Sequence, residues 1–232
     1  LMTLFACGLG WGQDFNGEYS FEGTIGNVGS LSYNGSAITN LTVGALTKTG
    51  VTTSSSSGNS RASGWGTGST NGGAAGGSID LIKYFEFTIT ADSGYTISNP
   101  TLTYGVGRSG SGTRRFEWRW SIDSYGSALS VGTSNGSLIN TSGILETPDS
   151  NAGYTGNVIT TITSNQTTIT FRFYAYGAEG TSGTGGLQGN LTFGGTLVAN
   201  GSSASTTYTT AWLNSEPTAS VDAIIDGDLT TS

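Results

Sequence analysis

The chain has 232 residues and a formal net charge of −7, with 39 glycines, no histidine and one cysteine. The negative charge repels phosphate and argues against a nucleic-acid partner. The absence of histidine excludes every Ser-His-Asp or Cys-His catalytic arrangement and the usual zinc ligand. A single cysteine, Cys7, excludes an intrachain disulfide and a thiolate metal cluster, and no cofactor is expected.

The abundant glycine, serine and threonine disfavour helices, because these residues lose backbone entropy or compete for backbone hydrogen bonds. They suit short strands joined by polar turns. The aromatic share of 10% argues for a packed core rather than disorder. A chain of this length is ordinary for one all-β domain.

The chain begins with LMTLFACGLGWGQDF, an apolar run that turns abruptly polar. Residues 1–12 are interpreted as the remnant of a signal peptide, with cleavage between Gly12 and Gln13. Two alternatives stay open: lipidation at Cys7, or retention of the segment as an N-terminal strand. No stretch approaches the roughly 20 apolar residues of a transmembrane helix, so none is predicted.

Three stretches alternate apolar and polar residues with period two, the pattern of a half-buried strand. They are residues 83–90 (KYFEFTIT), 115–120 (RFEWRW) and 169–176 (ITFRFYAY). The alternation assigns to the core Phe85, Phe87, Ile89, Phe116, Trp118, Trp120, Ile169, Phe171, Phe173 and Ala175. It assigns to an exposed face Glu86, Thr88, Thr90, Arg115, Glu117, Arg119, Arg172, Tyr174 and Tyr176. Weaker strand candidates are residues 41–47, 101–107, 158–163 and 191–198.

Glycine- and serine-rich stretches separate these strands and are predicted to be loops: residues 54–77, 107–113, 132–137 and 177–186. Trp65, inside the first of them, is expected to cover an edge of the fold. Roughly eight to ten strands with spaced turns predict an all-β, two-sheet antiparallel β-sandwich of jelly-roll type with Gly/Ser-rich loops. This module spans residues 13–200.

Composition shifts after Asn200, and residues 201–232 are interpreted as a linker and the start of a following β-rich domain. The acidic residues Asp222, Asp226 and Asp228 are a weak calcium candidate, since closely spaced oxygen ligands bind calcium. An ordinary Asp-Gly turn explains the same residues and is the preferred interpretation.

Several motifs together resemble a known kind of protein: GWGQ near the start, SFEG at 20–23, the segment KYFEFTITADSGYTISNPTLTYGVGRSGSGTRRFEWRWSIDSY, and the later ITFRFYAYGAEGTSGTGG and GNLTFGGTL. They resemble the N-terminal β-sandwich module of secreted multidomain Bacteroidota proteins. The tail AWLNSEPTASVDAIIDGDLTTS resembles the lead-in to a β-solenoid segment. The resemblance implies export by the general secretory pathway and then by the type IX system, and it carries over no catalytic or binding residue.

The polar sides of the strongest strands provide the candidate ligand site: Arg115, Glu117, Arg119, Arg172, Tyr174 and Tyr176. Arg108 and Arg114 are expected nearby. Exposed aromatic rings with guanidinium and carboxylate groups suit sugar recognition, because rings stack on the apolar sugar face and polar groups bind hydroxyls. The competing interpretation, a ladder of cross-strand ion pairs on a solvated face, is favoured over a ligand site.

Glu86 and Glu117 also satisfy the residue types of a glycosidase carboxylate pair. Such pairs arise by chance in a chain with 15 acidic residues, so no catalytic residue and no enzyme activity are predicted. The expected function is a noncatalytic extracellular or cell-surface module for adhesion, surface structure or assembly. The alternative is a carbohydrate-binding-like accessory domain of a secreted hydrolase. Expected partners are the secretion machinery, and surface or matrix glycans, copies of the chain, or other surface proteins.

Overall fold

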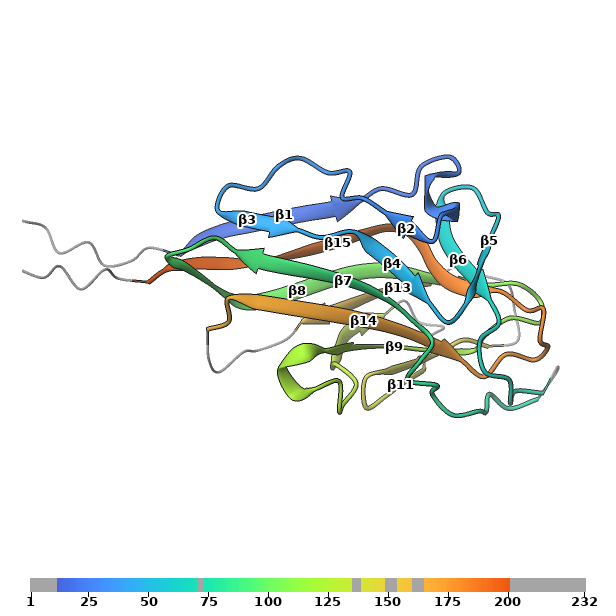
Figure 1. Cartoon of the computed structure of the whole chain (residues 1–232). Helices are drawn as coiled ribbons and strands as arrows, with labels where there is room; N and C mark the ends of the chain where they lie inside the picture. Colours follow the sequence, from blue (N-terminus) through green and yellow to red (C-terminus); the bar gives the residue numbers. More distant parts are fainter. Residues whose placement is uncertain (1–11, 71–72, 135–138, 149–153, 160–164, 201–232) are drawn as a thin grey trace, which may run out of the picture. The chain divides into compact units, whose positions relative to one another are not determined.

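The computed structural model describes residues 12–70, 73–134, 139–148, 154–159 and 165–200 (Figure 1). These residues form fifteen β-strands and two short 3-10 helices, η1 (Ile25–Asn27) and η2 (Ser121–Asp123). The strands build two antiparallel sheets, which confirms the predicted all-β sandwich. A second unit, residues 202–232, lies outside the described residues, as do the calcium candidates Asp222, Asp226 and Asp228.

The first sheet has seven strands. Its order is β10 (Val131–Ser134), β13 (Tyr154–Ile159), β8 (Tyr95–Arg108), β15 (Gly185–Ala199), β6 (Asn59–Ser63) and β5 (Thr52–Ser54), with β1 (Gln13–Tyr19) also on β15. The long strand β15 changes neighbour along its length. Its first residues pair with β6, and residues 191–197 pair with β1.

The second sheet has eight strands. Its order is β11 (Ile139–Thr141), β12 (Ile144–Glu146), β9 (Arg115–Trp120), β14 (Thr168–Tyr176), β7 (Tyr84–Ala91), β4 (Leu46–Thr49) and β2 (Ser30–Leu31), with β3 (Leu41–Val43) also on β7. From β7 onward the chain passes back and forth between the sheets, with β7, β9 and β14 in one and β8, β13 and β15 in the other. This winding is that of a jelly roll.

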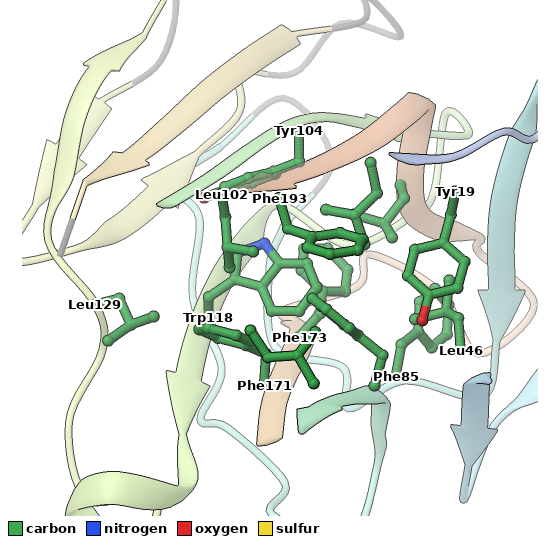
Figure 2. Packing of buried hydrophobic residues seen from close by; sticks show 14 of the residues in the cluster. Tyr19, Leu46, Phe85, Leu102, Tyr104, Trp118, Leu129, Phe171, Phe173 and Phe193 are labelled. Atoms are coloured by element: carbon green, nitrogen blue, oxygen red, sulfur yellow. The ribbon is translucent and has the colours of Figure 1, made fainter. Parts of the chain in front are cut away.

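Aromatic side chains fill the space between the sheets (Figure 2). Phe87 pairs with Phe171 and Phe85 with Phe173 across β7 and β14, and the Phe87 and Phe171 rings stack with centroids 5.2 Å apart. Trp118 is fully buried against Phe173, with ring centroids 5.2 Å apart. The alternation therefore predicted the inner face correctly, with one exception. Trp120, at the end of β9, is only partly buried.

Several short strands were not predicted. Residues 54–77 were expected to be a loop, yet they contain β6, whose inward residues Ser60 and Ala62 are buried. Small inward side chains give no hydrophobic period, so this strand has no signal in the sequence. Residues 41–47 form two strands, β3 and β4, rather than one, and both pair with β7.

The ends of the sandwich differ in character. Gln13 pairs with Leu197, so β1 begins and β15 ends at the same end of the fold (Figure 1). Arg108 pairs with Gly185 at the opposite end, where the glycine-rich loop segments 64–70, 73–83, 109–114 and 177–184 gather. Trp65, at the start of the first of these loops, belongs to the buried core, and its indole N–H donates to the carbonyls of Ala62 and Gly185.

Candidate functional site

The six predicted site residues lie together on the outer face of the eight-stranded sheet. Three come from β9 and three from β14, and these strands are direct neighbours. The register places Arg172 opposite Arg119, Tyr174 opposite Glu117, and Tyr176 opposite Arg115. Period-two alternation therefore identified a contiguous set of side chains.

The predicted exposure of this set is wrong for half of it. Glu117 and Tyr174 are each 1% exposed and Tyr176 is 4% exposed. Arg115, which lies opposite Tyr176, donates to the carbonyls of Ala75 and Gly77, so the glycine-rich segment 73–77 lies beside this end of the sheet. Alternation assigns a residue to a face but does not say what covers that face.

Glu117, Arg119 and Tyr176 form a polar cluster on this face, in which Glu117 and Tyr176 are buried. The Glu117 carboxylate accepts from Arg119 Nε at 2.6 Å and from the Tyr176 hydroxyl at 2.9 Å. Burial first, and then the negative charge of Glu117, raise the pKa of Tyr176 well above its ordinary value, so its hydroxyl remains a donor. These contacts make Glu117, Arg119 and Tyr176 a cross-strand support within the sheet face.

The more accessible part of the face carries a stack of three planar side chains, Tyr84, Arg172 and Tyr125, named here the Tyr–Arg–Tyr stack. The Arg172 guanidinium carbon lies 4.1 Å from the Tyr84 ring centroid and 3.9 Å from that of Tyr125. Arg172 Nε donates to Glu86, and these two side chains are 23% and 27% exposed. Cation–π contact on both faces of the guanidinium fixes its plane.

Sequence reasoning missed both tyrosines of the stack. Tyr84 falls on the polar side of the 83–90 alternation, so the period could have identified it. Tyr125 lies in a turn after η2, where no period exists, and it carries no comparable signal.

The turn that presents Tyr125 has an unusual backbone. Ser124 and Tyr125 have φ angles of 57° and 62°, the left-handed region that non-glycine residues avoid at a cost of roughly 1–2 kcal/mol each. Hydrogen bonds hold the turn: Asp123 accepts from the amides of Gly126 and Ser127, and Arg119 donates to the Tyr125 carbonyl at 2.9 Å. Arg119 thus joins the buried cluster to the exposed stack.

Threonines continue the outer face toward the other end of the sheet. The hydroxyls of Thr88 and Thr170 lie 2.9 Å apart across β7 and β14, and Thr168 donates to Thr90 at 3.4 Å. The face therefore changes along the strands from charged and aromatic to hydroxyl-bearing.

The charges on this face are matched. Its three arginines pair with three glutamates, as Arg115–Glu146, Arg119–Glu117 and Arg172–Glu86. Glu86 and Glu117, considered above as a carboxylate pair, are each engaged by a different arginine. This arrangement suits a rigid binding or structural face.

Arg108 and Arg114 do not belong to the outer face, contrary to expectation. Both are buried at the loop end of the sandwich, where they share one carboxylate: Glu179 lies 3.0 Å from Arg108 Nη2 and 3.7 Å from Arg114 Nη1. Arg108 also donates to the carbonyls of Ser109 and Gly110. Arg114 donates to those of Thr147 and Gly73. The two buried arginines and Glu179 therefore hold the glycine-rich loops together through hydrogen bonds and ion pairs.

The described part of the chain has neither a metal-binding cluster nor a membrane-spanning helix. That part holds no group of three or more Cys, Asp or Glu side chains placed to bind a metal ion. None of its helices is long and apolar enough to span a membrane. Cys7 lies outside the described residues, whereas Gly12 and Gln13 lie at their beginning.

The fold and face define a two-sheet jelly-roll module with a polar, aromatic sheet surface. No known family model matches the chain, and neither a curated protein nor a solved structure matches it.

Proposed function

We propose that the chain is a noncatalytic extracellular or cell-surface module that serves in adhesion, surface structure or assembly. The observation that carries this proposal is the outer face of the eight-stranded sheet. Its charges are matched in pairs, and its Tyr–Arg–Tyr stack is rigid and partly exposed. A preorganised face loses little conformational entropy on contact with a partner, which favours recognition.

The sequence supports the proposed extracellular or cell-surface localisation. The apolar start followed by Gly12 and Gln13 fits a secretory signal, and the resemblance to modules of secreted Bacteroidota proteins fits passage through the type IX system. The secretion machinery is then a transient partner. Surface glycans, other surface proteins or further copies of the chain are the lasting ones.

Surface exposure tests this proposal directly. Intact producing cells are treated with a membrane-impermeant biotin reagent and then fractionated, with a cytoplasmic enzyme as the control for lysis. We expect the chain in the biotinylated surface fraction or in the medium. Recovery of the unlabelled intact chain with the cytoplasmic control would overturn the proposal.

An accessory domain of a secreted hydrolase is the second candidate. The observation that favours it is the partly exposed tyrosine pair around Arg172, since aromatic rings beside polar groups suit sugar binding. Sequencing the complete gene discriminates between the candidates. A catalytic domain encoded in the same gene would support the accessory role, and a solenoid with a sorting domain would support the surface module.

A further inference from the structure

We propose that the Tyr–Arg–Tyr stack, with Glu86 beside it, is a binding site for a neutral polysaccharide. The inference rests on the proposed surface function and names the ligand class and the residues that contact it. Tyr84 comes from β7, Arg172 from β14, and Tyr125 from the turn after η2, so three separate segments converge on the site.

The backbone of the Tyr125 turn is the first argument. Two successive non-glycine residues in the left-handed region are strained, and glycine would relieve the strain at either position. Local hydrogen bonds keep Tyr125 in this conformation, among them those made by Asp123 and Arg119 and one from the Tyr125 amide to the Trp120 carbonyl at 2.9 Å. Strain retained at a partly exposed aromatic residue points to function rather than stability.

The hydrogen-bonding groups are the second argument. Arg172 supplies donors and Glu86 supplies acceptors, and both side chains are about a quarter exposed, at 23% and 27%. Adjacent sugar hydroxyls each donate and accept, so they match a guanidinium and a carboxylate held side by side. The Thr88 and Thr170 hydroxyls, two residues further along β7 and β14 on the same face, extend the polar row in the direction of a chain-like ligand.

Charge decides between neutral and anionic ligands. The three arginines on the face are each matched by a glutamate, and the whole chain carries a net charge of −7. An anionic polymer would meet no unmatched cation here and would be repelled over a distance. A neutral polysaccharide meets no such barrier.

Retention of the full chain on insoluble polysaccharides tests the site. Cellulose, curdlan and starch are the neutral probes, and a polygalacturonate gel is the anionic comparison. The informative variants are Tyr125→Gly, which removes the ring and relieves the strained backbone, and Ser124→Gly, which relieves the same turn but keeps the ring. Thermal melting is measured on each variant.

We expect retention on at least one neutral polymer and weaker retention on polygalacturonate. Tyr125→Gly should weaken binding about tenfold or more, a factor that corresponds to roughly 1.4 kcal/mol of lost contact. Its melting temperature should stay at or above that of the parent, and Ser124→Gly should bind like the parent.

Three results would overturn the site: no retention on any neutral polymer, unchanged retention of Tyr125→Gly, or stronger retention on polygalacturonate. A lower melting temperature for Tyr125→Gly, with unchanged binding, would make the ring a structural element. A chain found at the cell surface without polysaccharide retention would reject this site and leave the surface function standing. A chain retained on polysaccharide but confined to the cytoplasm would reject the surface function and leave the binding site standing.

Discussion

The outer face of the eight-stranded sheet holds a buried ion pair, Glu117–Arg119, and a partly exposed one, Glu146–Arg115. Removing the glutamate of each pair should therefore lower the free energy of unfolding by different amounts. The Glu117 side chain is 1% exposed and accepts hydrogen bonds from Arg119 Nε and the Tyr176 hydroxyl. Glu117→Ala leaves a guanidinium and a buried hydroxyl without their carboxylate. Removing one partner of a buried pair costs about 3–5 kcal/mol, and we expect a loss of that size.

Glu146→Ala is the matched control. Glu146 pairs with Arg115 through the same Nε–carboxylate contact at 3.1 Å, but its side chain is 25% exposed. An exposed pair contributes about 0–1 kcal/mol, so this variant should unfold close to the parent. Urea unfolding followed by tryptophan fluorescence measures both free energies of unfolding.

A double variant, Glu117→Leu with Arg119→Met, sharpens the measurement. Replacing both members of a buried pair by apolar residues avoids the uncompensated charge, so we expect it to recover much of the loss. Equal losses for Glu117→Ala and Glu146→Ala would refute the energetic difference between the buried pair and the partly exposed pair.

Three further predictions concern the core, the loop end and the pH dependence. Trp118→Ala should lower the free energy of unfolding in urea by about 3–5 kcal/mol. Trp118→Phe should lower it by clearly less, because the buried indole N–H has no partner among the described residues and no hydrogen bond is lost. Equal losses for the two variants would contradict this. Gly183→Ala should lower the melting temperature, since its Cβ would lie 1.9 Å from the Ser111 carbonyl oxygen, whereas Gly180→Ala, whose nearest atom is 3.5 Å away, should not. Burial lowers the pKa of Lys48 to about 8. Above that pH the unfolded chain therefore binds more protons than the folded chain does. The free energy of unfolding should rise from pH 8 toward about pH 9.5 in the parent but not in Lys48→Met.

Period-two alternation was enough to predict the inner faces of the central strands. Phe85, Phe87, Phe171 and Phe173 all point into the core because a strand's side chains must alternate and each run has one apolar side. The sheet pairing of β9, β14 and β7 then brought the predicted site residues together. This part of the site follows from local pattern and strand geometry.

The remaining features depend on contacts between distant segments. Arg115 bonds to carbonyls about 40 residues earlier in the chain, and no local pattern encodes that contact. Tyr125 reaches Arg172 only through a left-handed backbone that its residue type disfavours. Arg108 and Arg114 look like surface residues in the sequence, but loop carbonyls and Glu179 take the place of water around them.

The pairing of Gln13 with Leu197 has a mechanical consequence. Tension applied between the start of β1 and the end of β15 pulls two adjacent antiparallel ends apart. The hydrogen bonds of this pair are then loaded one after another, as in unzipping, rather than together, as in shear. The β1–β15 pair should therefore open at low force. The loops at the far end, which Arg108 and Arg114 brace, lie away from the line of pull and are not loaded until β1 has peeled away.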